Sequence, residues 1–396
     1  MAGRPRSEVI DESVVGVYHV WMRCIRRMFL CGYDPLTKQD FSHRKDWFGQ
    51  RLDELSRIFA VDACVWAILS NHYHLIVRNR PDLVRQWCDA EVVRRWWYLF
   101  PERRDDLGLP AEPTALEIRS LVEDRKRVAQ LRKRLSSISW FMKALNEWFA
   151  KRANACEDQI GHFWAERFGC RNLLDEGALL LCSIYIDLNE IRVELASRPE
   201  DSRYTSAYTR ILARILRRAR EESERQPPSP PTPTPPPSPP PPTDYRPGDP
   251  DYWMCPLSTD DRAPLLDVGT PASTAAAATS SDVLPDTTEA AASQDGGTVA
   301  KSWRHGFLPL TVDEYLEVLD RTGRLLVEGK PGAMDPQLEP ILVRLGIQPQ
   351  AWLTMLEKYE VWFHRFVGRA ENVLARAAAL GQSWVQGISH CRAGFS

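Results

Sequence analysis

The chain has 396 residues, 43% of them hydrophobic and 26% charged, which is typical of a soluble globular protein long enough for two domains. It contains no uncharged apolar run long enough to span a membrane, and its start lacks the apolar segment of a secretory signal, so we expect a cytoplasmic protein. Its nine cysteines include no CxxC pair, which argues against a disulfide framework and against a thiolate zinc site.

The net charge of −2 hides an uneven distribution. Residues 1–226 carry 38 Lys and Arg against 33 Asp and Glu, whereas residues 227–302 carry 3 against 10. Residues 303–396 are balanced, with 10 charges of each sign. The basic excess therefore lies in the N-terminal part, where a polyanion would bind. It is too small to indicate nucleic acid by itself.

The N-terminal part alternates between strand and helix patterns. Residues 14–23 (VVGVYHVWMR) alternate in the manner of a strand, and residues 41–59 place their large apolar side chains at helical spacing. The β-rich runs 63–69 and 71–77 are separated by two polar residues and predict a hairpin. Helical, basic stretches follow at 83–100 and 115–153.

The order of these elements predicts the fold class. Residues 161–172 indicate a strand or an extended loop, and residues 175–189 a helix with Asp175 as its N-cap. Strand, helix, two strands and helix form the beginning of a ferredoxin-like split βαβ unit. We therefore expect an α+β fold, with a ferredoxin-like antiparallel sheet and a helical insertion at about 79–160.

A proline-rich boundary follows this part. Residues 227–242 contain 12 prolines in 16 positions, which favours polyproline II, and an acidic segment poor in large apolar residues continues to 302. Within it, the island 251–257 is expected to dock locally. Thr311 and Glu314 have the spacing of a capping box at the start of a helical region. We predict two folded parts, 1–226 and 303–396, joined by a disordered linker at 227–302, with the second a separate small all-α domain.

The stretch SNHYHLIV, residues 70–77, contains two histidines two positions apart. In a strand, His72 and His74 point to the same face, with their Cα atoms ~7 Å apart. Two imidazoles on one rigid strand provide two corners of a divalent metal site and leave positions open for water and phosphate oxygens. An isolated pair of this kind is more often an ordinary polar pair on an exposed sheet face.

The helix at 175–189 ends in CSIYIDLNE, which places Tyr185 and Asn189 four residues apart on one face. The phenol of Tyr185 could act as a nucleophile and the amide oxygen of Asn189 as a third metal ligand. Taken alone, the pattern fits better an amphipathic helix whose Tyr185 packs against the sheet. Among the other tyrosines, Tyr73 must face away from the histidines, and Tyr204 and Tyr208 precede a basic tail and are weaker candidates.

Together these motifs resemble the single-tyrosine HUH transposases, especially the REP-associated tyrosine transposases. The resemblance covers about residues 14–210 and matches the family in order and separation. It rests on YHVWMR at 18–23, SNHYHLIV at 70–77, GHFWAERF at 161–168 and YIDLNEIR at 185–192. It implies metal binding at His72, His74 and Asn189, with Tyr185 as the nucleophile. There are two departures: Glu190 stands where the family usually has Pro, and the insertion at 79–160 is longer than in compact members.

The resemblance implies an enzyme that uses Mg²⁺ or Mn²⁺ to cut and rejoin single-stranded or hairpin-ended DNA. Tyr185 would form a 5′-phosphotyrosyl intermediate and release a 3′-hydroxyl, without a nucleotide cofactor. An unperturbed tyrosine has a pKa of about 10, so a metal or a base must help to ionise it, and the sequence shows no certain base. Two alternatives stay open: a replication initiator or relaxase with the same chemistry, and a non-catalytic DNA-binding protein derived from a transposase. A homodimer that shares tyrosines in trans also stays open.

Cations close to aromatic side chains predict a surface for single-stranded DNA. On the first strand the candidates are His19 and Arg23. The alternative interpretation of His19 is a structural role. The remaining candidates lie at 94–97 and 125–134: Arg94, Arg95, Arg125, Lys126, Arg127, Arg132, Lys133 and Arg134. Acidic residues are interspersed around both stretches, so a solvated helix face is an equal alternative. The region 303–396 is expected to recognise DNA ends or to mediate self-association.

Overall fold

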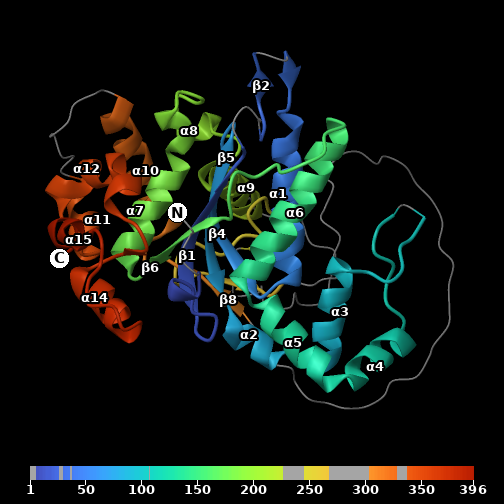
Figure 1. Cartoon of the computed structure of the whole chain (residues 1–396). Coiled ribbons are helices and arrows are strands. Elements are labelled where there is room, and N and C mark those ends of the chain that lie inside the picture. Colours follow the sequence, from blue (N-terminus) through green and yellow to red (C-terminus); the bar gives the residue numbers. More distant parts are fainter. Residues whose placement is uncertain are drawn as a thin grey trace.

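The computed structural model describes residues 6–25, 30–35, 38–106, 108–225, 245–266, 303–327 and 337–396. Most of the predicted linker, 226–244 and 267–302, lies outside the described residues. A central sheet has helices on both faces (Figure 1). Its strand order is β4-β5-β1-β6-β9. The strands are β1 (Gly16–Arg23), β4 (Val61–Ile68), β5 (His72–Asn79), β6 (Gly169–Leu173) and β9 (Phe366–Val367).

The sheet is mixed. The predicted hairpin of β4 and β5 is present, and β1 lies antiparallel to both β5 and β6, whereas β6 and β9 are parallel. The predicted first helix is present as α1 (His43–Ile58), between β1 and β4. In the register of β1 and β5, Arg23 pairs with His72 and Gly16 with Asn79. Arg23 and His72 therefore mark one end of the sheet, and Asn79 marks the other.

One face of the sheet packs against α1 and α6 (Ile138–Cys156) (Figure 1). Alternate residues of β5, among them Tyr73 and Leu75, are fully buried there, as their strand positions predict. The Tyr73 hydroxyl donates a hydrogen bond to Oδ1 of Asn146 at 2.6 Å, so the one polar group that this ring buries is paired. Burial of each such side chain contributes about 1.5–3 kcal/mol.

The predicted helical insertion packs at the Asn79 end of the sheet, because α2 begins directly after β5 and α5 contacts α2. Besides α6, its helices are α2 (Pro81–Gln86), α3 (Asp89–Leu99), α4 (Ala115–Glu123) and α5 (Arg125–Leu135). Helix α4 begins with a capping box in which Thr114 and Glu117 exchange hydrogen bonds. Helices α2 to α5 therefore lie toward the Asn79 end, whereas α6 extends along the sheet to Tyr73, the neighbour of His72.

The other face of the sheet packs against α7 (Glu176–Asp187), whose residues 177–187 are all buried. Its sequence, EGALLLCSIYID, is apolar on every side, so the sheet alone cannot cover it. The C-terminal segment supplies the remaining cover (Figure 1). Its helices are α10 (Val312–Val327), α11 (Glu339–Arg344), α12 (Trp352–Glu357), α13 (Tyr359–Trp362), α14 (Ala370–Ala379) and α15 (Ile388–Gly394).

The C-terminal segment therefore differs from the separate all-α domain predicted from sequence. Its buried side chains form one cluster with α7 and the sheet, and β9 extends the sheet edge. The predicted Asp175 cap is present, and the same carboxylate accepts hydrogen bonds from the Arg369 backbone at 2.6 Å and from Asn372 at 3.0 Å. The capping box at Thr311 is confirmed.

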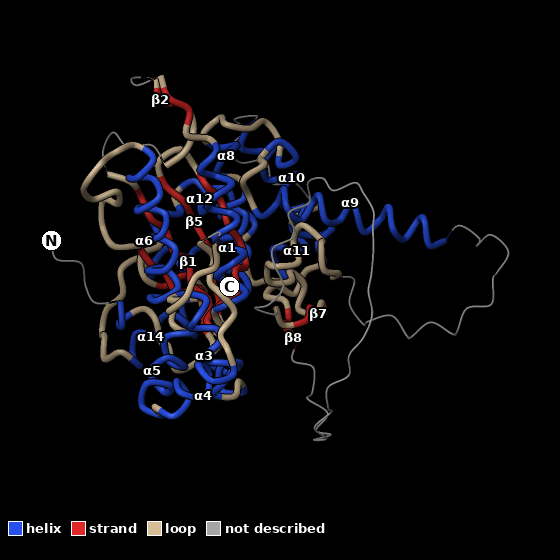
Figure 2. Tube along the Cα trace, turned by 90° about the vertical axis from the view of Figure 1, so that its right-hand side faces the viewer, coloured by secondary structure: helices blue, strands red, loops and turns tan. Residues whose placement is uncertain are grey.

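The region between α7 and the C-terminal segment contains α8 (Asn189–Arg192) and α9 (Ser206–Arg225), and the far end of α9 projects from the molecule (Figure 2). The island 251–257 packs on α9, where Arg217 forms an ion pair with Asp251 at 2.5 Å. Arg217 also pairs with Asp249, just before the island, at 3.2 Å. Short strands complete the description: β2 (Tyr33–Asp34), β3 (Gln39–Asp40), β7 (Arg262–Pro264) and β8 (Trp303–His305).

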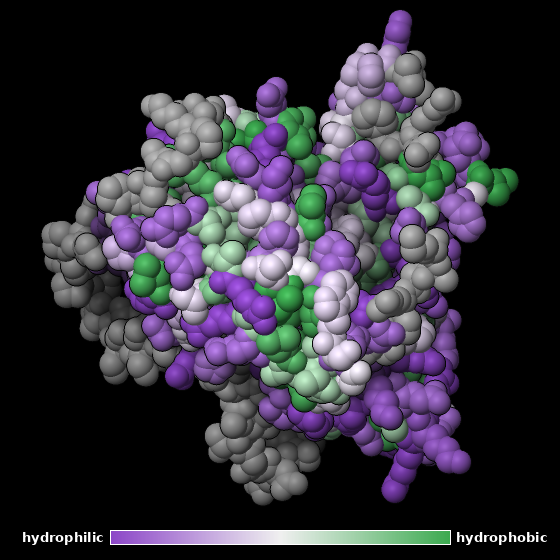
Figure 3. Space-filling view, turned by 60° about the vertical axis from the view of Figure 1, so that its left-hand side comes forward, coloured by the Kyte–Doolittle hydropathy of each residue, from purple (hydrophilic) through white to green (hydrophobic). Residues whose placement is uncertain are grey.

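The exterior is mainly hydrophilic on the side that carries the C-terminal helices, and hydrophobic side chains gather near the middle of that face (Figure 3). Most large apolar residues of these helices are in the core instead, among them Trp352, Tyr359 and Phe363. None of the described helices combines the length and the hydropathy that a membrane span requires.

Candidate functional site

Three histidines lie on the α7 side of the sheet, on the neighbouring strands β1 and β5. Nε2 of His19 and Nδ1 of His74 form a hydrogen bond of 2.9 Å. The rings of His72 and His74 have centroids 5.0 Å apart and are nearly perpendicular, at 84°. Nδ1 of His72 lies 2.6 Å from Oδ1 of Asn71. The two strand histidines therefore adjoin each other, and His19 supports the inner one.

All three imidazoles are held in the neutral state. Burial, followed by the positive charge of Arg23, lowers the pKa of His72 to about 4. Burial also lowers the pKa values of His19 and His74 well below the ordinary histidine value. A neutral imidazole keeps one nitrogen lone pair, which is the form that binds metal ions.

His74 has a nitrogen suited to a ligand. Its Nε2 is buried and has no hydrogen-bond partner among the described residues. When Nδ1–H of His74 donates to His19, the Nε2 lone pair is available, and His19 acts as the outer partner that metal-bound histidines ordinarily have. This orphaned atom and the neighbouring His72 fit two ligand positions of a divalent cation.

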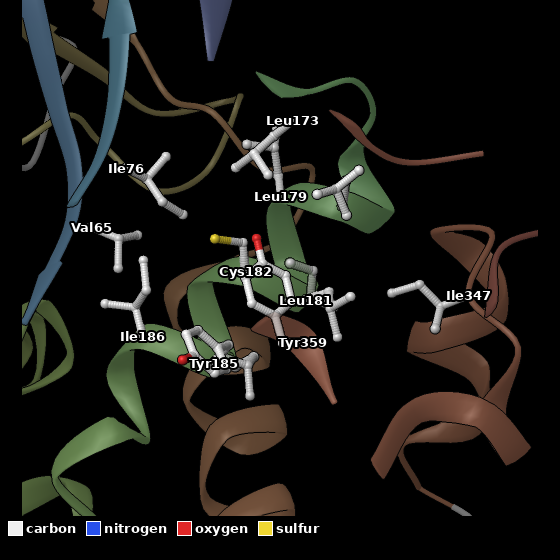
Figure 4. Close-up of a cluster of buried hydrophobic side chains, with 14 of the residues drawn as sticks. Val65, Ile76, Leu173, Leu179, Leu181, Cys182, Tyr185, Ile186, Ile347 and Tyr359 are labelled. Atoms are coloured by element: carbon white, nitrogen blue, oxygen red, sulfur yellow. The ribbon is translucent and has the colours of Figure 1, made fainter. Parts of the chain in front are cut away.

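Tyr185 lies beside this pair, on α7. Its ring meets the His74 ring edge-on, with centroids 5.7 Å apart. The same ring also stacks on Tyr359 of α13, with centroids 4.5 Å apart (Figure 4). Its hydroxyl donates a hydrogen bond of 2.9 Å to Oε1 of Glu360. Burial, followed by the Glu360 carboxylate, raises the pKa of Tyr185. The phenol is therefore close to the histidines, but it holds its proton firmly.

Asn189 does not join the cluster through a hydrogen bond to either imidazole within the described residues. Helix α7 ends at Asp187 and α8 begins at Asn189, whose side chain is buried with Nδ2 unpartnered. Glu190, at the position where proline was expected, forms an ion pair of 3.1 Å with Lys45 of α1. In the part of the chain that the structure describes, no three His, Cys, Asp or Glu side chains are arranged to hold one metal ion.

A pocket of about 410 Å³ opens in front of the histidines. Its polar lining comes from His72, His74, Arg23, Glu166, Arg167, Arg171 and Glu360. Arg23 and Arg167 are exposed, and no described carboxylate forms an ion pair with either. Arg171 is buried and donates from Nε to the Phe363 carbonyl at 2.7 Å. The pocket therefore combines two neutral imidazoles, three cationic side chains and two carboxylates, and the excess of cations suits a phosphate group.

A second pocket of about 780 Å³ continues from the first and shares Glu166, Arg167 and Gly169 with it. Arg6, Arg365 and Trp384 also line it, and Trp384 is 71% exposed. Arg365 forms an ion pair with Glu8 at 2.9 Å. Cations and an exposed indole along one path are suited to an unpaired nucleic-acid strand.

The other predicted DNA contacts lie away from this site. Helix α5 packs on α2 at the Asn79 end of β5, and the eight residues of this strand span ~23 Å. Arg95 is buried and donates to the backbone carbonyls of Ile58 and Leu266, and Arg132 pairs with Asp89 at 2.7 Å. These two arginines therefore stabilise the insertion.

The remaining cations of the insertion differ in their accessibility. Arg94 lies 3.6 Å from Glu91, and Arg134 lies over the Trp140 ring at 4.4 Å. Four predicted contacts on α5 are exposed: Arg125, Lys126, Arg127 and Lys133.

Sequence reasoning missed Glu360, Tyr359 and Arg171. Glu360 and Tyr359 belong to a segment without a recognisable motif, about 175 positions after Tyr185, so nothing local signalled them. For Arg171 there was a weak indication in the sequence, because it closely follows the GHFWAERF motif. In the structure it pairs with His19 across strands β1 and β6.

No protein-family model matches the chain, and no curated protein matches it. Among solved structures, a similar chain is a REP-associated tyrosine transposase bound to a REP hairpin. It is 11% identical with a TM-score of 0.29, and the match covers 50% of this chain and 79% of that one. A similarity this low shows neither a shared fold nor a function.

Proposed function

We propose that this chain is a transposase-type endonuclease and strand transferase for single-stranded DNA, with Tyr185 as its nucleophile. The observation that carries the proposal is the position of the Tyr185 ring, 5.7 Å between centroids from His74, beside a pocket lined by histidines and arginines. A phenol, two neutral imidazoles and unpaired cations are what tyrosine attack on a phosphodiester requires.

The pocket would hold the scissile phosphate. His72 and His74 would bind Mg²⁺ or Mn²⁺, which would polarise a non-bridging phosphate oxygen. Asn189 stays a candidate for the third ligand, although it needs a side-chain movement to reach the histidines. Arg23 and Arg167 would contact the phosphate charge. Four strands in the order β4-β5-β1-β6, with α1 between β1 and β4, support a ferredoxin-like core for this site.

In the reaction, the Tyr185 oxygen would form a bond to phosphorus as the bond to the 3′-oxygen breaks. The products would be a 5′-phosphotyrosyl protein and a free 3′-hydroxyl, and attack by another 3′-hydroxyl would rejoin the strand. Tyr185 is only 5% exposed and does not line the pocket, whereas Glu360 does. Attack on a phosphate in the pocket therefore needs a movement of the Tyr185 or the Glu360 side chain.

The DNA strand would leave the pocket along the second pocket, past Arg167 toward Trp384. This path offers cations for phosphates and an aromatic face for a base. The exposed cations of α5 are a second proposed contact surface, for a duplex or hairpin stem at the other end of the sheet. A homodimer stays part of the proposal only if the tyrosines act in trans.

The proposal is tested by incubating the full chain with Mn²⁺ and labelled, hairpin-ended single-stranded DNA. We expect a covalent protein–DNA adduct that survives denaturing electrophoresis and maps to Tyr185 by peptide mass spectrometry. Tyr185→Phe should form none, whereas Tyr208→Phe, on α9, should form as much as wild type. Equal adduct in wild type and Tyr185→Phe, or none in either, would contradict the proposal.

A non-catalytic DNA-binding protein is the second candidate. It is favoured by the burial of Tyr185 and the rise in its pKa, and by Glu190, which ties α8 to α1 in place of the expected proline. This candidate requires DNA binding that is unchanged in Tyr185→Phe and the absence of adduct in wild type. A replication initiator or relaxase would form the same adduct, and the choice of DNA substrate would distinguish it.

A further inference from the structure

Among the described residues, the Glu360 carboxylate accepts the hydrogen bond of the Tyr185 hydroxyl, at 2.9 Å. Glu360 also lines the pocket that contains His72 and His74. It is the pocket residue that contacts the phenolic oxygen directly, whereas His74 meets the ring by its edge. Glu360 therefore bridges the phenol and the space where a phosphate would bind.

The position of Glu360 is fixed by contacts on both sides. The preceding residue, Tyr359, stacks on Tyr185 at 4.5 Å. The Glu360 carbonyl accepts a hydrogen bond from Arg171 at 3.3 Å, and the Phe363 carbonyl accepts one at 2.7 Å from the same guanidinium. A few residues later, β9 joins the sheet beside β6. The segment therefore holds the carboxylate against the phenol with strand β6 as its support.

We propose that Glu360 is the general base that accepts the phenolic proton of Tyr185 during attack on the phosphodiester. This inference rests on the proposed function and assigns the base that the motifs leave unassigned. A carboxylate in hydrogen-bond contact with the attacking oxygen has the position that general base catalysis requires. The alternatives nearby are less suited, because Arg192, over the Tyr185 ring at 4.9 Å, is a cation, and His19 and His74 bond to each other.

The step balances without an external oxidant or reductant. The phenolic proton passes to Oε1 of Glu360 as the tyrosine oxygen bonds to phosphorus. The phosphorus–3′-oxygen bond breaks, and the leaving 3′-oxygen takes a proton from water. When the strand is rejoined, the attacking 3′-hydroxyl gives its proton to water, and its oxygen bonds to phosphorus as the bond to the Tyr185 oxygen breaks. The protonated Glu360 then returns its proton to the departing phenolate. The same carboxylate thus acts as base in cleavage and as acid in rejoining.

The test compares Glu360→Gln with Glu357→Gln, a matched change on the preceding helix at an exposed glutamate. Each is prepared with tyrosine at position 185 and with 3,5-difluorotyrosine there, whose phenol ionises at lower pH and needs less help from a base. The readouts are the single-turnover rate of adduct formation, Mn²⁺ affinity by calorimetry, and thermal unfolding. The full chain is used throughout.

We expect Glu360→Gln to slow adduct formation about 100-fold with tyrosine, the usual size of a general-base effect, and by only a few fold with difluorotyrosine. Glu357→Gln should match wild type, and Mn²⁺ affinity should be unchanged in both. The proposal is overturned by an equal loss on both tyrosines, or by weaker Mn²⁺ binding in Glu360→Gln, which would make Glu360 a metal ligand. No adduct from wild type would instead refute the proposed function.

Discussion

Asp187 lies two residues after Tyr185 and should make the stability of the fold depend on pH. Its side chain is fully buried and accepts hydrogen bonds from the Ser206 hydroxyl at 2.5 Å, the Ala207 backbone at 3.1 Å and the Tyr315 hydroxyl at 2.5 Å. These bonds favour the carboxylate, but burial outweighs them and raises the pKa of Asp187 to about 6. Helix α7 is thereby joined to α9 and α10 by a carboxyl group that keeps its proton up to about pH 6 in the folded protein.

Because folding raises the pKa of Asp187, the protein should lose stability as the pH rises. Below the unfolded value of 3.8, Asp187 is protonated in both states and costs nothing. As the pH rises toward about 6, the unfolded chain loses the proton while the folded protein keeps it, so stability falls across this window. The difference between a pKa of 3.8 in the unfolded chain and about 6 in the folded protein corresponds to ~3 kcal/mol of stability, all of which is lost above the folded pKa.

The measurement is urea unfolding of wild type and Asp187→Asn from pH 4 to pH 8. The amide keeps an oxygen for Ser206 and Ala207 and does not ionise. We expect wild type to lose ~3 kcal/mol relative to Asp187→Asn between about pH 4 and pH 7. Parallel stability curves for the two proteins would refute the reasoning, because the pH dependence would then come from other groups.

Two further predictions concern the surface and the core. Arg23→Met should weaken the binding of a single-stranded oligonucleotide in fluorescence titrations at several salt concentrations. The slope of the log binding constant against the log salt concentration should become shallower by about 0.7, the value for one lost phosphate contact. Lys133→Met, at an exposed position on α5, is the comparison, and a loss confined to Lys133→Met would place the strand at the other end of the sheet. Tyr73→Phe should cost about 1–3 kcal/mol in urea unfolding, because it leaves Oδ1 of Asn146 unpaired in the core. Its adduct yield should equal that of wild type, and a lower yield at full stability would show that Tyr73 contributes to the site.

The N-terminal elements were predictable because their signals are local. Strand alternation placed β1, β4 and β5, helical spacing placed α1, and Asp175 marked the start of α7. The two-residue period also put His72 and His74 on one face and Tyr73 on the other. The approach of Tyr185 to the histidines followed from a family resemblance, since no local pattern relates the distant residues 74 and 185.

The C-terminal segment could not be placed from its own pattern. Helix α10 is amphipathic and its capping box at Thr311 is recognisable, but nothing in it shows which surface it covers. The missed signal was in α7, whose sequence has no polar face and therefore requires cover on both sides. The two-residue strand β9 is too short for a period, so its pairing with β6 depends on tertiary contacts alone.

Because β9 pairs with β6, the surroundings of Tyr185 are complete only after residues 359–367 have been synthesised. Tyr185 and the strand histidines leave the ribosome well before residues 359–367, and N-terminal regions generally begin to fold first during synthesis. Until the later segment arrives, the nascent chain has an uncovered α7, an open edge at β6 and no carboxylate beside the phenol. Tyr185 would therefore acquire its hydrogen-bond partner Glu360 only late in translation, so that unfinished chains carry the phenol in an unassembled setting.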